Sequence, residues 1–151
     1  MITRHFSLFF LFVSLLVITG CSEPVPFGST VERKYFPNGK VQSEFIITDK
    51  EQMSGILKKY GPDEELTSTV TIRNGVRHGV EKLYDKEGHV LRTTPYVNGK
   101  KDGDEKGYFP NGDIWFSLPY RNGVLNGDAY MYAQDGKVVR HAVYKDGKIT
   151  N

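Results

Sequence analysis

Cysteine is almost absent from this chain: Cys21 is the one example in 151 residues. A disulfide framework within the chain is therefore excluded. A large excess of charge of either sign is also lacking, since the formal net charge is +2. Such a balance gives no general reason to expect nucleic acid as a partner. Glycine, at 16 residues, and aromatic residues, at 13%, are plentiful instead. This mixture favours β-strands joined by tight turns.

Sequence motifs for catalysis and metal binding are lacking as well. His78, His89 and His141, the histidines beyond the apolar leader, do not have the spacing of a metal-ligand set. No P-loop, nucleophile–base order or pair of carboxylates rises above the repeat pattern described below. We therefore predict no enzyme activity, no cofactor and no metal site, and we expect no small-molecule substrate. The protein is expected to act by binding.

The one long apolar run lies at the start of the chain and predicts an export signal. Arg4 supplies positive charge, and Phe6–Ile18 follows without any charged residue. These 13 residues are too few for a permanent membrane-spanning helix, but they suit the core of a signal peptide. The run leads into Val17–Cys21 (VITGC), which resembles the lipobox of bacterial lipoproteins.

The lipobox resemblance implies lipidation of the Cys21 sulfur and cleavage after Gly20. Residues 1–20 would be the signal peptide, residues 21–30 a lipidated tether, and 31–151 the repeat region. Two or three acyl chains of the palmitate type hold a protein durably, at about 0.8 kcal/mol per buried CH₂. Ser22 implies the outer membrane, facing the periplasm, if the source is a diderm bacterium. An ordinary cleaved signal followed by an incidental cysteine is the alternative.

A period of 24 residues organises the rest of the chain. Four consecutive units cover residues 56–79, 80–103, 104–127 and 128–151. Val31–Gly55 fits as a further unit with one extra residue. Of the 14 glycines after residue 30, 12 fall into three columns of this alignment, which chance does not explain. The tyrosines form two columns, Tyr35, Tyr60, Tyr84, Tyr108 and Tyr132 in one and Tyr96, Tyr120 and Tyr144 in the other.

Each unit is predicted to form a β-hairpin. In one unit, Val80–Asp85 is the first strand, Lys86–Gly88 the turn and His89–Val97 the second strand. Asn-Gly and Asp-Gly pairs recur at the reversals, where they tolerate the positive φ of tight turns. Such short turns join antiparallel neighbours. We predict an all-β fold: a repetitive antiparallel meander of about ten strands, five hairpin units in one curled sheet.

Two units carry a family resemblance best: residues 84–103 (YDKEGHVLRTTPYVNGKKDG) and 108–127 (YFPNGDIWFSLPYRNGVLNG). They resemble the variant MORN repeat. The resemblance spans 31–151 and is weakest at 31–79, where Asp49-Lys50 replaces Asn-Gly and Glu64 replaces Gly.

Bacterial members of this family are often lipoproteins of unknown role, and some are described as antitoxin components of toxin–antitoxin pairs. The resemblance implies a membrane-anchored scaffold of the cell envelope that acts through protein–protein interaction. An antitoxin or immunity protein that occludes a cognate toxin is the alternative.

Alternation along the second strands predicts two different faces of the sheet. One phase, with Phe116 and Tyr120, is predicted to form a core face together with the first tyrosine column. The other phase gains six apolar residues in the last three units, namely Leu91, Pro95, Trp115, Pro119, Val139 and Val143. We hypothesise that they form a stripe that binds a protein partner or a second copy, with Trp115 as anchor. Burial by curling or by a register shift is the open alternative.

A column of basic residues accompanies the first strands: Arg33, Lys58, Lys82 and Lys106. Two interpretations stay open. These residues contact anionic headgroups or glycans near the membrane, or their stems cover aromatic side chains and keep the surface soluble.

Overall fold

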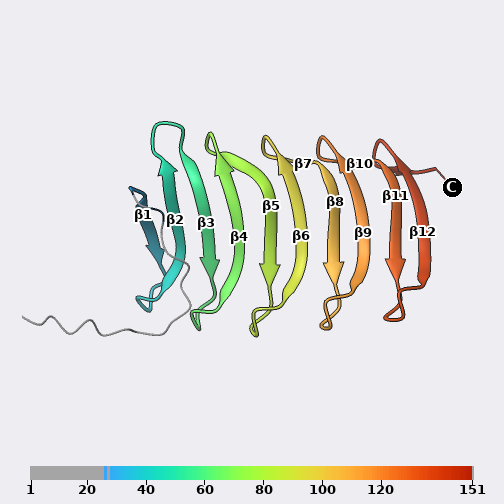
Figure 1. Ribbon diagram of the computed structural model, residues 1–151, viewed down its shortest axis with the longest axis horizontal. Helices are drawn as coiled ribbons and strands as arrows, with labels where there is room; N and C mark the ends of the chain where they lie inside the picture. Colours follow the sequence, from blue (N-terminus) through green and yellow to red (C-terminus); the bar gives the residue numbers. More distant parts are fainter. Residues whose placement is uncertain (1–25, 27, 151) are drawn as a thin grey trace, which may run out of the picture.

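The computed structural model describes residues 26 and 28–150, which form one antiparallel β-sheet (Figure 1). The strands are β1 (Thr30–Tyr35), β2 (Val41–Asp49), β3 (Ser54–Tyr60), β4 (Leu66–Arg73), β5 (Val76–Tyr84), β6 (Val90–Val97), β7 (Lys100–Lys101), β8 (Gly103–Tyr108), β9 (Ile114–Arg121), β10 (Val124–Leu125), β11 (Gly127–Tyr132), β12 (Val138–Lys145) and β13 (Lys148–Ile149). Within these residues no helix has the length and hydropathy needed to cross a membrane.

The long strands pair with their neighbours in sequence order, as Figure 1 shows. The five hairpins are β1–β2, β3–β4, β5–β6, β8–β9 and β11–β12. The predicted all-β meander of hairpin units is therefore confirmed. The first and last strands do not pair with each other, so the sheet is open. It is at most mildly curved, and the strong curling that would hide one face is not seen.

The connections between repeats are tight turns that are hydrogen-bonded to one another. Asn74 and Gly75 both have positive φ, 51° and 74°, as a two-residue type I′ hairpin turn requires. The Gly75 N–H donates to the carbonyl oxygen of Met53 in the preceding connection, at 3.1 Å. The glycines of the next three turns repeat this bond: Gly99 to Arg77, Gly123 to Lys101 and Gly147 to Leu125. The turns thus link successive repeats along one end of the strands.

A β-bulge in each hairpin decides which side chains share a face. In β8–β9, Gly107 pairs with Phe116 and Tyr108 pairs with Ile114, so Trp115 is the additional residue. Shifts at the corresponding position interrupt the other four hairpins. Because paired residues project to the same side, the extra residue places Ile114 and Phe116 on opposite faces.

The prediction that both tyrosine columns share a core face is wrong. The Tyr84 hydroxyl lies 3.2 Å from the Thr69 hydroxyl, and Lys82 pairs with Thr69 on that side of the sheet. Lys82 also pairs with Thr93, three residues before Tyr96, so Tyr96 lies on the other side. We call these sides the Tyr84 face and the Tyr96 face. The prediction requires unbroken alternation along each second strand, and the bulge interrupts that alternation by one residue.

A single layer of strands buries few side chains. Among the described residues, the buried hydrophobic ones are Ile46, Ile47, Val70, Tyr96 and Ala129. Ile46 pairs with Ile56 and belongs to the Tyr84 face, whereas Ile47 pairs with Gly55 and belongs to the Tyr96 face. Hence the small apolar core lies on both faces, and most of each face remains accessible to a partner.

Candidate functional site

The structure divides the six apolar residues of the predicted stripe between the two faces. Trp115 packs against Phe116, with ring centroids 5.3 Å apart, on the Tyr96 face. Leu91 lines the same hollow, and Val139 has the equivalent bulge position one repeat further on. Pro95, Pro119 and Val143 instead pair with Val80, Asp104 and Asp128 on the Tyr84 face. The bulge is the reason that the six do not form one stripe.

We call Leu91, Trp115 and Val139 the bulge row. Their exposed fractions are 47%, 45% and 63%, which is high for large apolar side chains. Successive repeats lie two strands apart, so neighbours in this row are about 10 Å from each other. Between Leu91 and Trp115 lies a shallow hollow of about 330 Å³ that Leu83 and Phe116 also line. The bulge row is thus an open apolar surface.

Pro95 and Pro119, on the Tyr84 face, pack against the connections between repeats. The Pro95 ring lies 3.0 Å from the position that a Cβ on Gly103 would occupy, and the Pro119 ring lies 3.3 Å from that of Gly127. Each proline carbonyl accepts a hydrogen bond from the connection to the next repeat, at Asp102 and Asn126. Because this connection departs from the regular ladder, the missing proline N–H leaves no ladder bond unmade.

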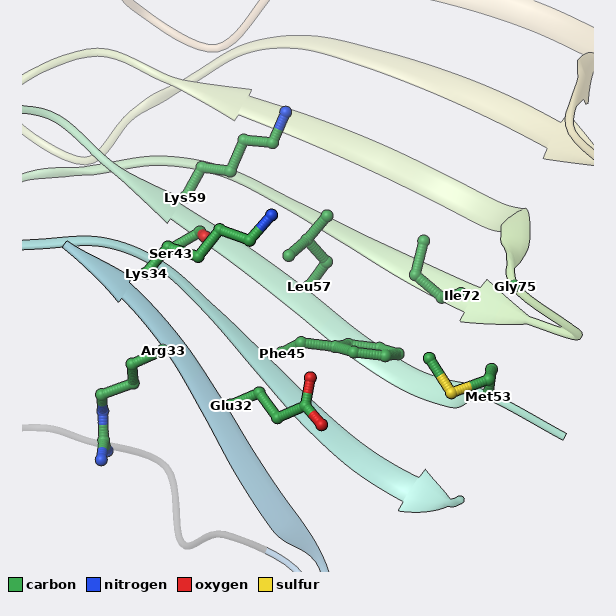
Figure 2. A pocket seen from close by; sticks show the side chains of 10 residues that line it. All are labelled: Glu32, Arg33, Lys34, Ser43, Phe45, Met53, Leu57, Lys59, Ile72 and Gly75. Carbon is green, nitrogen blue, oxygen red and sulfur yellow. The ribbon is translucent and has the colours of Figure 1, made fainter. Parts of the chain in front are cut away.

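A second hollow, of about 430 Å³, lies on the Tyr96 face of the first two repeats (Figure 2). Phe45, Leu57 and Ile72 form its apolar floor, with Met53 at one end. Lys34 and Lys59 lie at the other end, and both pair with Ser43 between them. Within the described residues neither lysine forms an ion pair. Sequence reasoning missed this hollow, because its residues come from three strands of two repeats.

The next repeats fill the equivalent positions with charged and aromatic side chains. Met53, Leu57 and Ile72 correspond to Lys101, Glu105 and Tyr120 two repeats later. The Lys101 ammonium donates to Glu105 and lies 4.5 Å from the centroid of the Tyr120 ring. The Thr94 hydroxyl donates to the same carboxylate at 2.9 Å, and Glu105 is 4% exposed.

The pKa of Lys101 reflects this arrangement. Burial alone would lower it, but the hydrogen bond and the charge of Glu105 outweigh burial and raise the pKa above its usual value. The Lys101 ammonium is thus held in its charged form and makes a structural ion pair with the buried carboxylate.

The repeat between them has the same kind of filling. Arg77 donates to the Tyr96 hydroxyl at 3.1 Å, stacks over its ring and lies 3.9 Å from Glu81. The third and fourth repeats, each taken with the connection that precedes it, therefore contain a charged triplet. The second repeat with its preceding connection contains the apolar triplet Met53, Leu57 and Ile72.

The basic column lies on the Tyr84 face. Lys58, Lys82 and Lys106 each pair with a threonine on a neighbouring strand, and they follow one another at intervals of two strands. Arg33 donates to Glu44 at 2.7 Å, and the Tyr60 hydroxyl donates to the same carboxylate at 2.8 Å. Arg33 therefore forms an ion pair, which distinguishes it from the three lysines of the column.

One group of possible metal ligands occurs among the described residues. Ligand atoms of Asp85, Glu87 and His89 lie within 4.8 Å of one another in the β5–β6 turn. Hydrogen bonds within the turn account for their closeness, since the His89 N–H donates to Asp85 at 2.7 Å and the His89 ring lies 3.0 Å from the same carboxylate. The group is largely exposed, and nothing else near it points to an ion.

The predicted lipidation residue, Cys21, lies outside the described residues, together with the signal peptide and most of the tether. Lipidation of Cys21 and the cell-envelope location therefore stay predictions.

The described residues thus form an open repetitive sheet with shallow apolar hollows on one face. Residues 30–46, 77–98 and 101–122 match the family model of the MORN repeat variant. These three segments are therefore repeats of this variant, a kind of repeat that is generally involved in binding proteins or membranes. No curated protein matches the chain. The second repeat, with its apolar triplet, lies largely outside the matched segments.

Proposed function

We propose that this protein is a lipid-anchored scaffold of the cell envelope that binds a protein partner through its bulge row. The surface runs across the last three repeats and is the single observation that carries the proposal. Exposed apolar rows of this kind are typical of contact sites. Trp115 is the anchor of the surface, because large aromatic side chains dominate binding energy at interfaces.

The geometry around Trp115 supports this role. Phe109 lies at 6.3 Å and Phe116 at 5.3 Å from Trp115, measured between ring centroids. These contacts hold the indole while 45% of the residue stays exposed. An ordered, half-exposed indole loses little conformational entropy on binding. A partner with an apolar ridge that fits the hollow between Leu91 and Trp115 would bury it.

Crosslinking on membranes followed by identification of the captured proteins tests the bulge row. Trp115→Ser should remove the captured partner, with a loss of at least about tenfold in yield. Val80→Ser is the matched control, because Val80 is 48% exposed but lies on the Tyr84 face. Equal capture by wild type and Trp115→Ser would refute the proposal. Capture of a toxin whose activity the chain blocks would favour the antitoxin or immunity role over the scaffold.

The membrane anchor is proposed from the lipobox, with Cys21 as the acylated residue. Cys21→Ser should move the protein from the membrane fraction to another fraction and should abolish metabolic labelling with an acyl-chain precursor. Labelling that persists in this variant would exclude Cys21 as the lipidated residue.

A further inference from the structure

The two ends of the hollow in the first two repeats differ: one end is basic and the other is apolar. Lys34, Ser43 and Lys59 are paired with one another across three strands at one end. Phe45 and Leu57 pair two residues further along, about 7 Å away. Ile72 follows after another two residues, opposite Gly55, and Met53 closes the far end. Two cations thus precede an apolar floor about 14–20 Å long. Glu32, which pairs with Phe45, lines the β1 side of this floor, so the positive end of the hollow is confined to Lys34 and Lys59.

Comparison with the neighbouring repeats shows that this hollow is a local exception. In the third and fourth repeats the triplet positions are filled by ion pairs under a tyrosine ring. In the second repeat Leu57 and Ile72 replace the carboxylate and the tyrosine, and Phe45 lies beside them. The shorter and apolar side chains leave the space open.

A ligand on this floor would contact side chains only, because the main-chain groups beneath it are already paired. β2, β3 and β4 lie inside the sheet, and the ladders β1–β2, β2–β3 and β3–β4 cover the residues beneath the hollow. An extended peptide would therefore find no main-chain partners there. An acyl chain needs none, because burial of its methylene groups at about 0.8 kcal/mol each is its source of affinity.

We propose that this hollow binds a free, single-chain anionic amphiphile of the fatty-acid type. Its carboxylate lies between the ammonium groups of Lys34 and Lys59, within reach of the Ser43 hydroxyl. Its chain runs over Phe45, Leu57 and Ile72 towards Met53, as the arrangement in Figure 2 allows. The ligand is a monomer and not a bilayer, because the hollow, at about 430 Å³, has the volume of a small-ligand pocket. This activity goes beyond partner binding by the bulge row and uses none of its residues.

Photo-crosslinking with dodecanoate that carries a diazirine tests the proposal on the full chain in phosphatidylcholine nanodiscs. Mass spectrometry should place saturable crosslinks on Phe45, Leu57 or Met53, and unlabelled dodecanoate should compete. The methyl ester of the same probe should label about fivefold less, as loss of the charge contact predicts. A second arm carries the diazirine on a phosphatidylglycerol in the nanodisc bilayer. Labelling of the hollow from that arm alone would overturn the proposal.

A graft from the next repeat supplies the decisive variant. Met53→Arg, Leu57→Glu and Ile72→Tyr together reproduce the triplet that already folds in the third repeat. The graft should reduce labelling of the hollow by at least about tenfold, while the circular dichroism spectrum and the capture of a partner through Trp115 are unchanged. Lys34→Ala with Lys59→Ala should remove the preference for the acid over the ester. Unchanged labelling in the graft, or equal labelling by acid and ester in the wild type, would overturn the proposal.

Discussion

The second and fourth repeats build the same backbone pattern and fill it in opposite ways. Leu57 pairs with Phe45 and Val70 in the second repeat, whereas Glu105 pairs with Leu118 in the fourth and is bonded to Lys101. The first filling leaves a hollow, and the second closes the same place with a buried carboxylate. The difference teaches that the glycine and tyrosine columns specify the sheet, and that the triplet positions can vary between ligand-binding and structural uses.

One glycine column differs in backbone conformation between β3 and β5, the first long strands of two successive hairpins. Gly55 lies in the regular ladder of β3, whereas the equivalent Gly79 has a φ of +79°. A Cβ on Gly55 would collide with the carbonyl oxygen of Ile46, while a Cβ on Gly79 would meet nothing closer than 3.8 Å. The longer β2–β3 connection, in which Asp49-Lys50 replaces Asn-Gly, accompanies this difference.

The largest expected effect comes from Gly55→Ala. The substitution forces the backbones of β2 and β3 apart, so we expect a loss of about 3 kcal/mol in the free energy of unfolding. Gly79→Ala is the matched control and should cost about 1 kcal/mol through its positive φ alone. Denaturant unfolding followed by circular dichroism measures both. Equal losses would show that the close approach of Gly55 to Ile46 is unimportant.

Glu105→Ala should have the next largest effect. It leaves Lys101 and Thr94 without their acceptor beneath the Tyr120 ring. Loss of one partner of a buried pair costs about 3–5 kcal/mol, and because the Lys101 side chain is 30% exposed we expect about 2 kcal/mol. Denaturant unfolding is the measurement, and a loss below 0.5 kcal/mol, roughly that of a neutral surface change, would contradict it.

The double variant Lys101→Met with Glu105→Leu gives the fourth repeat two residues of the apolar triplet. Replacement of a paired charge by apolar side chains is often neutral, so stability should stay within about 1 kcal/mol of the wild type. Strong destabilisation in unfolding experiments would mean that the two fillings are not interchangeable.

Glu64→Gly should stabilise the protein modestly. Glu64 has a φ of +70° at a turn position that glycine occupies in the other hairpins. Relief of this conformation is worth about 1 kcal/mol, and loss of the exposed contact to Lys40, at 3.7 Å, should matter little. Glu64→Ala is the control, since alanine keeps the unfavourable φ. A gain in melting temperature with both variants would point to another cause.

The smallest effect concerns alkaline pH and Tyr60. Burial first, and then the hydrogen bond to Glu44, raise the pKa of Tyr60 to about 12. The raised pKa favours the protonated phenol in the folded state. Its contribution to stability is therefore complete below the unfolded pKa, about 10, and is lost as pH rises towards 12. Absorbance titration of tyrosinate should show a component near pH 12 that Tyr60→Phe removes.

Much of the fold could be predicted because glycine and tyrosine recur with a fixed period. Asn74-Gly75 and its relatives mark turns that few other residue pairs adopt, so strand order followed from local chemistry. The faces could not be predicted, because the bulge beside Trp115 adds one residue to the alternation and leaves no clear mark in the sequence. For the same reason the six apolar residues were assigned to one stripe although they lie on two faces.

The hollow was hidden for a different reason. Lys34, Leu57 and Ile72 lie on three strands, and their closeness depends on the registers of two hairpins.

The sequence by itself determined that this chain folds into repeated antiparallel hairpins, because backbone conformations at its turns are available chiefly to glycine and asparagine. The lipobox in the sequence also predicts lipidation of Cys21. The tertiary structure alone decided which side chains meet, because the side on which a strand residue projects depends on every bulge before it. The separation of Leu91, Trp115 and Val139 from the prolines follows from that register. So does the position of Lys59 at the end of the apolar hollow.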